Sequence, residues 1–415
     1  MSFNKVSVIG LGYIGLPTAA VIASRGIKVT GVDVNQHAVN TINAGDIHIV
    51  EPDLDIAVRS AVTVGMLRAT TTPEPAEVFM IAVPTPFIGD NHEPDLSYIK
   101  AAAKAIAPIL EKGNLIILES TSPVGTTEKL AGWLKEARQD LSFPQDKGDD
   151  ADINVAHCPE RVLPGFVMQE LISNDRVIGG LSPHCADKAA SLYKTFVRGE
   201  CIITNARTAE MAKLTENAFR DVNIAFANEL SVICDKLKIN VWELVKLANR
   251  HPRVNILNPG PGVGGHCIAV DPWFIIDRCP DEAKIIRQAR LINDAKPSYV
   301  IEQITKAADE FKRPVIACLG LAFKADIDDL RESPALQIVE ELANKDIGQI
   351  IAVEPNVQAI PKKLVEAGVE QTSLETALEK ANVVVVLVDH KEFKAADKIQ
   401  FTTKIVIDTR GIVSA

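Results

Sequence analysis

The sequence lacks three features that mark other classes of protein: C-x-x-C pairs, blocks of basic residues and long apolar runs. Its longest purely aliphatic run, Val383 to Val388, has six residues, whereas a membrane-spanning helix needs ~20. The seven cysteines are odd in number, which argues against a disulfide framework or a zinc ribbon. With a net charge of −10 and no basic stripe, the chain does not fit a nucleic-acid-binding protein.

The remaining composition is that of a globular chain, with 47% hydrophobic and 24% charged residues. At 415 residues the chain is too long for one compact core and should form two or three domains. Residues 1–10 run straight into an apolar strand, without the pattern of a secretory signal. We therefore expect a reduced, cytoplasmic enzyme.

Residues 1–204 alternate short aliphatic runs with helical patterns. Continuous aliphatic runs are typical of parallel strands that are buried on both faces. The expected strands are residues 5–10, 28–33, 78–83, 115–119 and 153–157, with helices at 16–25, 37–44, 96–111 and 126–138. This alternation predicts a doubly wound α/β domain with a parallel sheet.

A long helix is expected from Asn205 to about Leu237, where proline and glycine are absent and apolar residues recur at helical spacing. Such a helix of ~33 residues would measure ~50 Å, a length that usually joins domains or packs against a partner subunit. Residues 205–309 should form a helical middle domain. Residues 310–415 should form a second, smaller α/β domain, with strands at 315–319, 350–353, 383–388 and 404–407.

The motif Gly10-Leu-Gly12-Tyr-Ile-Gly15 follows the first expected strand and opens a helix. The first glycine permits a tight turn, the second lets the backbone approach a pyrophosphate, and the third allows close helix–strand packing. The phosphates would sit at the helix N-terminus. Tyr13 and Ile14, between the glycines, are taken as cofactor-binding residues with them.

Asp33 ends the second expected strand, eighteen residues beyond Gly15. An acid at this place accepts hydrogen bonds from the adenosine ribose and repels a 2′-phosphate, which favours NAD over NADP. Taken alone, Asp33 could also be a helix N-cap.

The turns at residues 83–86 and 119–125 each follow a strand of the same expected sheet. Ligands of open α/β sheets bind at the carboxyl ends of the strands, so Thr85, Pro86 and Thr121 are candidate cofactor contacts. The alternative is that these residues only set turns and helix caps.

Two further candidate pairs are Glu160 with Arg161, after a strand, and Lys213 with Asn217, on the long helix. Glu160 could be a general base and Arg161 an anion contact, or both could lie at the surface. Lys213 and Asn217 are four residues apart and share one helix face. A lysine beside a carboxamide can hold a developing oxyanion, although Lys213 alone could be a solvated charge.

The segment from Pro259 to Asp271 reads P-G-P-G-V-G-G-H-C-I-A-V-D, with four glycines in six residues ahead of Cys267. Glycines let the backbone approach a ligand closely. A cysteine beside His266 on such a loop is a candidate nucleophile, because a nearby imidazolium lowers the pKa of a thiol. The alternative is a small buried apolar residue. Because His266 has no second ligand at metal-site spacing, no metal is expected.

A last motif, residues 323–334, follows the first strand of the second α/β domain. Ser333 and Pro334 fit the N-cap and first residue of a helix. Lys324 and Arg331 would then flank a loop at the ligand-binding edge of the sheet, suited to a second phosphate-bearing molecule. A mixed-charge surface loop is the alternative.

An NAD site together with a nucleophilic cysteine favours one reaction. Hydride leaves readily from an alcohol carbon, but an aldehyde has no alkoxide to expel a second hydride. A thiolate converts the aldehyde into a thiohemiacetal, whose oxyanion can expel hydride and leave a thioester for water to release as acid. The residues therefore predict oxidation of an alcohol to a carboxylate in one pocket.

These motifs, in this order over essentially the whole chain, resemble the UDP-glucose/GDP-mannose dehydrogenase family. The resemblance rests on residues 10–17, 119–121, 158–161, 212–217, 264–271 and 323–334. It implies two Rossmann-like domains joined by a long helix that also forms the core of a homodimer. It also implies NAD as cofactor and a UDP-sugar as substrate.

The resemblance also implies roles for single residues. Cys267 matches the nucleophile of the family, Lys213 and Asn217 match the lysine and asparagine that stabilise the oxyanion, and Asp271 matches their carboxylate partner. Thr121 matches the threonine that positions water, and Glu160 matches the acid–base glutamate. The implied contacts to the nucleotide sugar are Glu160, Arg161, Lys213, Asn217, Arg253, Gly264, Lys324 and Arg331. The sugar-contacting arginine of the family lies near Arg250 or Arg253, and the alignment does not fix which.

Two departures narrow the implied substrate. UDP-glucose members have serine and lysine where this chain has His266 and Val270, and the pattern here resembles members acting on N-acetylated hexosamines. Residues 253–256 and 273–274 resemble the mannosamine branch. We expect oxidation at C6 of UDP-linked N-acetylmannosamine with two NAD⁺ and one water, for a bacterial surface polysaccharide.

Several alternatives stay open. The substrate could be UDP-linked N-acetylglucosamine, N-acetylgalactosamine or glucose. Sugars that differ at a single epimeric centre call for no difference in the motifs that elementary chemistry can explain. A two-electron hydroxyacid dehydrogenase would share the first domain but has no use for Cys267. A protein that only senses NAD would lack activity altogether.

Overall fold

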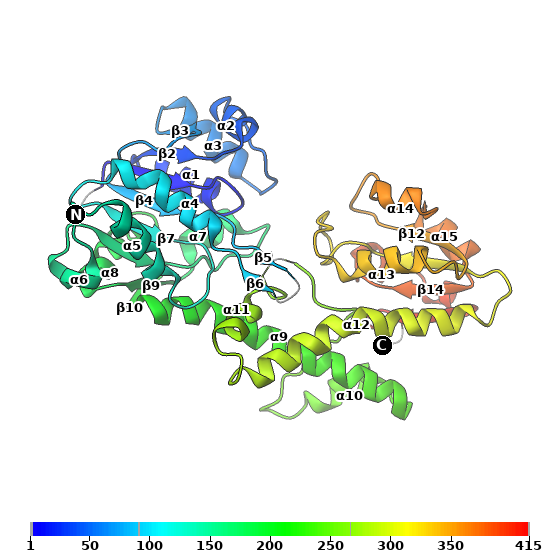
Figure 1. The fold of residues 1–415 in the computed structure, drawn as a ribbon. Coiled ribbons are helices and arrows are strands. Elements are labelled where there is room, and N and C mark those ends of the chain that lie inside the picture. Colours follow the sequence, from blue (N-terminus) through cyan, green and yellow to red (C-terminus); the bar gives the residue numbers. More distant parts are fainter. Residues whose placement is uncertain (1–2, 90–91, 266, 414–415) are drawn as a thin grey trace. The chain divides into compact units, whose positions relative to one another are not determined.

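The computed structural model describes residues 3–89, 92–265 and 267–413 and confirms an α/β protein with two separate sheets and long helices (Figure 1). The chain forms two compact units. The first unit is Met1–Glu216 with Trp273–Cys279, and the second is Asn217–Pro272 with Pro280–Ala415. The three-domain division at residues 204 and 309 stays a prediction.

The first unit holds an eight-stranded sheet with the order β10-β9-β8-β7-β4-β1-β2-β3. The strands are β1 (Lys5–Ile9), β2 (Lys28–Val32), β3 (Leu67–Thr70), β4 (Val78–Ile81), β7 (Leu115–Leu118), β8 (Asn154–His157), β9 (Arg176–Gly180) and β10 (Cys201–Asn205). Neighbours are parallel except β8 and β9, so the purely parallel sheet that we expected has one antiparallel pair.

Both faces of this sheet are covered. Along β4, Val78 and Met80 join one apolar cluster while Phe79 and Ile81 join the other. Side chains alternate between the faces of a strand, so a strand buried on both faces must be apolar throughout. This is why the aliphatic runs predicted the central strands within a residue or two.

The helices of the first unit connect these strands. They are α1 (Gly15–Ala23), α2 (Gln36–Asn43), α3 (Leu54–Thr63), α4 (Ser97–Ile106), α5 (Thr126–Ala137), α6 (Pro144–Lys147), α7 (Val167–Ser173) and α8 (Pro183–Tyr193). Short 3₁₀ helices lie at Ala107–Ile109 and Gly148–Asp150, and a small hairpin pairs β5 (Phe87–Ile88) with β6 (Glu93–Pro94). Asn35 caps α2 by accepting a hydrogen bond from the N–H of His37 at 3.0 Å.

The long helix is α9 (Ala206–Leu237), one residue from the predicted start, and it carries residues of both units. It is followed by α10 (Val241–Ala248), α11 (Asp271–Arg278) and α12 (Lys284–Ala308). Within the second unit, α9 and α12 share a buried polar network. Arg290 and Asn293 of α12 both bind Asp221 of α9, Arg290 through an ion pair and Asn293 through an amide hydrogen bond at 2.8 Å.

The second unit also holds a five-stranded parallel sheet with the order β13-β12-β11-β14-β15. Its strands are β11 (Val315–Leu319), β12 (Gln349–Val353), β13 (Glu370–Gln371), β14 (Val383–Val386) and β15 (Ile405–Asp408). Its helices are α13 (Pro334–Ala343), α14 (Lys362–Glu366), α15 (Leu374–Lys380) and α16 (Lys391–Lys394), with a 3₁₀ helix at Lys398–Phe401. Ser333 caps α13 as predicted. Across the described ranges, each helix is either too short or too polar to cross a bilayer.

Candidate active site

The glycine turn after β1 has the geometry of a dinucleotide loop. Gly10 has φ of +92°, and a Cβ there would lie 2.6 Å from the carbonyl oxygen of Ala82. A Cβ on Gly15 would lie 1.8 Å from the carbonyl oxygen of Gly10, so α1 packs on the turn only because both residues are glycines. A Cβ on Gly12 would meet no described atom within 4 Å, which leaves that side open to a ligand.

Asp33 supports this turn from the end of β2. Its Oδ2 accepts a hydrogen bond from the N–H of Leu11 at 2.9 Å and its Oδ1 accepts one from the N–H of Asn35 at 2.8 Å. The side chain stays half-exposed, so it remains accessible to a ribose. The N-cap of α2 is Asn35, which removes the alternative interpretation of Asp33 as the cap.

The turns after β4 and β7 are joined at the same edge of the sheet. The Oγ1 of Thr85 donates to the carbonyl of Thr121 at 2.6 Å, and the Oγ of Ser120 donates to the carbonyl of Val83 at 2.7 Å. Because β1, β4 and β7 are neighbours, the structure gathers the glycine turn, Thr85, Pro86 and Thr121 at one edge.

Glu160 is buried and held by two donors, so the alternative of a surface glutamate is wrong. Its Oε1 accepts the N–H of Arg161 at 2.7 Å, and its Oε2 accepts from Nη1 of Arg176 at 2.5 Å. Arg176 is only 1% exposed. The Arg161 guanidinium is half-buried and forms an ion pair with Glu216 of α9 at 2.6 Å.

A second buried acid lies behind Glu160. The hydroxyl of Tyr193 donates to Oε1 of Glu119 at 2.7 Å. Burial, followed by the charge of Glu160, raises the pKa of Glu119 to about 8. Arg176 completes the group, with its guanidinium 5.7 Å from the centre of the Tyr193 ring. We call these four residues, Glu119, Glu160, Arg176 and Tyr193, the Glu160 cluster.

Sequence reasoning missed Arg176 and Tyr193, which lie beyond the motifs on β9 and α8. A usable signal was present for Glu119, because it is the one charged residue directly after the apolar strand Leu115–Leu118.

On α9, Asn217 is buried and donates from Nδ2 to Oδ2 of Asp271 at 2.5 Å. The structure therefore joins two residues that are 54 positions apart in sequence. Lys213, one helical turn earlier, is half-buried and not the fully solvated charge of the alternative interpretation. The Asn217 contact ties the long helix to the segment that carries Cys267.

Cys267 is exposed, which removes the interpretation of a buried apolar residue. Its carbonyl accepts the N–H groups of Val270 at 3.1 Å and Asp271 at 2.9 Å, so a tight turn leads directly into α11. His266 lies outside the described residues. An exposed sulfur on a turn has the accessibility that a nucleophile needs.

The glycine-rich segment before Cys267 packs on α9 and on the loop before α13. The N–H of Gly260 donates to Oδ1 of Asn228 at 2.9 Å. A Cβ on Gly264 would lie 2.5 Å from the carbonyl oxygen of Glu332. The backbone thus comes too close to the loop before α13 for any side chain at residue 264.

A small pocket opens where this segment meets the carboxyl edge of the second sheet. Its lining includes Pro261, Phe323, Lys324, Pro334 and Arg410. Arg410, which sequence reasoning missed, follows the last strand and is held by Asp389 at 2.5 Å.

Arg331 was predicted beside Lys324, but the structure turns it toward Asp329, with an ion pair of 2.6 Å, and it does not line this pocket. Arg250 and Arg253 are both exposed after α10, and the choice between them stays a prediction.

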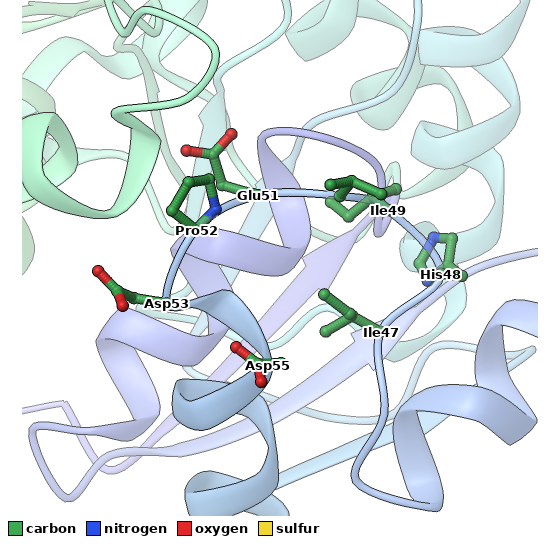
Figure 2. A pocket seen from close by; sticks show the side chains of 8 residues that line it. Ile47, His48, Ile49, Glu51, Pro52, Asp53 and Asp55 are labelled. Atoms are coloured by element: carbon green, nitrogen blue, oxygen red, sulfur yellow. The ribbon is translucent and has the colours of Figure 1, made fainter. Parts of the chain in front are cut away.

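A larger hollow of about 430 Å³ lies inside the bend between α2 and α3, lined by Ile47, His48, Ile49, Val50, Glu51, Pro52, Asp53 and Asp55 (Figure 2). Glu51 anchors the bend by accepting the N–H groups of Gly165 at 3.0 Å and Val167 at 2.8 Å. Since none of the predicted site residues lines this hollow, it is a separate feature.

Models of one family match almost the whole chain in three consecutive parts. They are described as the UDP-glucose/GDP-mannose dehydrogenase family: NAD binding domain at residues 4–197, central domain at 207–295 and UDP binding domain at 317–415. The chain belongs to this family.

Relatives within the family agree with this assignment. A UDP-N-acetyl-D-mannosamine dehydrogenase of Campylobacter jejuni is 66% identical over 94% of this chain and 96% of its own length. An NDP-N-acetyl-D-galactosaminuronic acid dehydrogenase of Ralstonia nicotianae is 63% identical over 100% of this chain and 97% of its own. The solved UDP-D-ManNAc dehydrogenase of Pyrococcus horikoshii superposes with a TM-score of 0.87 at 39% identity, covering 99% of this chain and 96% of that one.

Family membership explains why each of the two sheets carries candidate ligand-binding residues at one edge. The NAD binding domain contains the glycine turn and Asp33, and the UDP binding domain contains Lys324 and Arg410. The predictions of family, of NAD as cofactor and of two Rossmann-like sheets are therefore confirmed. The chain is an NAD-dependent UDP-sugar dehydrogenase.

The Glu160 cluster predicts a pH effect on stability. Because the pKa of Glu119 rises from 4.5 to about 8 on folding, the folded chain keeps a proton that the unfolded chain releases. This contribution to stability is full below the unfolded pKa and is lost as the pH rises through the folded one. Glu119→Gln should remove that loss. From pH about 5 to about 9 its free energy of unfolding should gain on that of the wild type by on the order of 1 kcal/mol or more, and its Tm should rise accordingly.

Thermal unfolding across this pH range, followed by circular dichroism, measures the difference. Glu111→Gln, an exposed carboxylate of the same unit, serves as the control. If both variants follow the wild-type pH dependence, the buried acid does not hold a proton.

Proposed function

We propose that the chain oxidises the C6 hydroxyl of UDP-N-acetyl-D-mannosamine to a carboxylate, consuming two NAD⁺ and one water. The observation that carries the proposal is the buried Asn217–Asp271 hydrogen bond of 2.5 Å beside the turn that exposes Cys267. This contact supports a fixed oxyanion donor on the helix and an exposed nucleophile four residues before Asp271. The chemistry supplied by bound NAD⁺ is acceptance of one hydride in each oxidation.

In the first oxidation the C6 hydroxyl releases its proton to solvent. Lys213 and Asn217 stabilise the negative charge of the resulting alkoxide until loss of hydride from C6 turns it into a carbonyl. Asn217 suits this role because one N–H of its amide binds Asp271, which orients the other. The product is an aldehyde.

In the second oxidation, the sulfur of Cys267 bonds to C6 and forms a thiohemiacetal. Its oxyanion is held by the same Lys213 and Asn217. Collapse of this oxyanion expels hydride and leaves a thioester on Cys267.

Hydrolysis completes the reaction. Thr121 positions a water, Glu160 takes up a proton from it, and the water attacks the thioester carbonyl. The C–S bond breaks, the thiolate of Cys267 leaves, and the uronic acid is released. The rigid ion pair with Arg176 at 2.5 Å supports Glu160 as an oriented acceptor.

The choice of N-acetylmannosamine rests on residues 253–256 and 273–274 and on the relative from Campylobacter jejuni at 66% identity. The 63% relative named for N-acetylgalactosaminuronic acid spans all of this chain and makes UDP-N-acetylgalactosamine the second candidate. Assay of NADH formation with the UDP-linked forms of both sugars, N-acetylglucosamine and glucose decides between them. We expect two NADH per molecule of the mannosamine derivative, and a ratio of one would refute a four-electron oxidation.

The role of Cys267 predicts that Cys267→Ala loses formation of the acid by a factor of roughly 10³ or more, as expected for removal of a covalent nucleophile. The binding of NAD and UDP should be unchanged. Cys279→Ala is the matched control, since Cys279 is also exposed, directly follows α11 and has no assigned role. Acid production by Cys267→Ala at the wild-type rate would exclude the thioester.

A homodimer through α9 is part of this proposal. Phe219, Phe226 and Ile233 of α9 are 68%, 52% and 44% exposed. Their spacing of seven places them on one helix face, the pattern of a helix that packs against another. Three large apolar side chains in one line favour burial by a second copy.

Phe226→Glu should therefore shift the molecular mass in light scattering from dimer to monomer, because a charge would be buried without a partner. Ile399→Glu, at an apolar residue of the second unit that is 70% exposed, should leave the mass unchanged. A dimer that persists in Phe226→Glu would rule out this face.

A further inference from the structure

The turn after β11 repeats the turn after β1. Gly320 has φ of +94° and Gly10 has φ of +92°. The N–H of Gly320 donates to the carbonyl of Val353 at 2.8 Å, just as the N–H of Gly10 donates to the carbonyl of Val32 at 2.8 Å. The UDP binding domain therefore retains the backbone of a dinucleotide turn.

An acid follows the second strand in each sheet. Glu354 comes directly after β12, as Asp33 comes directly after β2. The Oε2 of Glu354 accepts the N–H groups of Leu321 at 2.8 Å and Ala322 at 3.0 Å. Leu321 follows Gly320 as Leu11, whose N–H binds Asp33, follows Gly10. Both carboxylates thus fix the turn that follows the first strand.

The two acids differ in what covers them. Asp33 is half-exposed, whereas Glu354 is 4% exposed. The imidazole of His390, which is fully buried, lies with Nε2 3.1 Å from Oε2 of Glu354. His390 is the fourth residue after β14, the same offset that separates Thr85 from β4. A histidine therefore stands at the place that Thr85, a candidate cofactor contact, has in the first sheet.

The hydrogen bonds of His390 fix its tautomer. Its Nδ1 lies 2.9 Å from the backbone N–H of Asp326, which can only donate. Nδ1 is therefore the acceptor, and Nε2 carries the proton that is directed at Glu354. Oδ1 of Asp326 in turn accepts the N–H of Lys391 at 3.0 Å, so the two loops hold each other.

These contacts hold a strained turn. Asp326 has φ of +62°, a left-handed conformation that is costly for a residue with a side chain. Lys324, two residues earlier, lines the small pocket at the sheet edge together with Arg410. Loss of the His390 contact would free Asp326 to relax and would move the backbone that carries Lys324.

We propose that His390 is the positioning residue of the UDP binding domain. It covers the acid that would otherwise accept a ribose of an adenine dinucleotide, and it fixes the turn that aims Lys324 at the diphosphate of UDP. The inference extends the proposed function but depends only on UDP as the ligand, whichever sugar is attached.

Calorimetric titration of the full-length protein with UDP and, separately, with NAD tests this inference. His390→Ala should weaken UDP binding at least tenfold and leave NAD affinity unchanged. In turnover assays the KM for the UDP-sugar should rise while kcat at saturation stays within a few-fold. Added imidazole, which can refill the space, should restore part of the UDP affinity.

His390→Gln keeps a donor near Glu354 in a similar volume, so it should lose less UDP affinity than His390→Ala. It also provides a test if the His390→Ala protein does not fold. His184→Ala, a histidine of the first unit, is the control for UDP binding.

Unchanged UDP affinity in a folded variant would overturn the proposal. Equal weakening of UDP and NAD would also overturn it, because the effect would then be global. Two NAD molecules per wild-type chain would contradict the covering of Glu354. Failure to oxidise UDP-N-acetyl-D-mannosamine, by contrast, would refute the proposed function and leave these binding results unaffected.

Discussion

A carboxylate that follows the second strand and binds backbone N–H groups of the turn after the first strand is the constraint on which both nucleotide sites depend. Asp33 does this in the first sheet and Glu354 in the second. The N–H groups of the turn that face a ligand must stay without hydrogen-bond partners in a helix or strand, so regular structure does not hold the turn in place. The carboxylate supplies the fixed partner that holds such a turn in place before a ligand arrives.

The same logic extends to the segment that carries Cys267. Asn228 of α9 binds the N–H of Gly260, and Asn217 of α9 binds Asp271. Two asparagines of one helix therefore hold both ends of a twelve-residue stretch, residues 260–271, whose glycines would otherwise leave it without a defined path. A segment that is held at both ends and exposes Cys267 between them suits a nucleophile that must form a bond to the substrate and later release it.

Sequence reasoning succeeded where the signal is local. Aliphatic runs placed the central strands, the absence of proline and glycine placed α9, and Ser333 with Pro334 placed the start of α13. Cys267, Asn217 and Asp271 were picked out as candidate residues, but the hydrogen bond between Asn217 and Asp271 was not predicted. The missed residues are those whose role depends on long-range contacts: Arg176 lies sixteen residues after Glu160, and His390 lies 36 residues after Glu354. No periodicity in a single sequence links such positions.

The Glu160 cluster shows how buried charges are tolerated inside the first unit. Two carboxylates and one guanidinium without solvent would leave an uncompensated negative charge, which is costly in a buried environment. A pKa of about 8 keeps Glu119 protonated at neutral pH, so Arg176 balances Glu160 alone and the cluster is neutral. Tyr193 then binds a neutral acid, and the contact with Arg176 fixes the orientation of Glu160. The general-base role that we propose for Glu160 would need such a rigid surrounding, because a carboxylate that rotates away from its water cannot accept a proton.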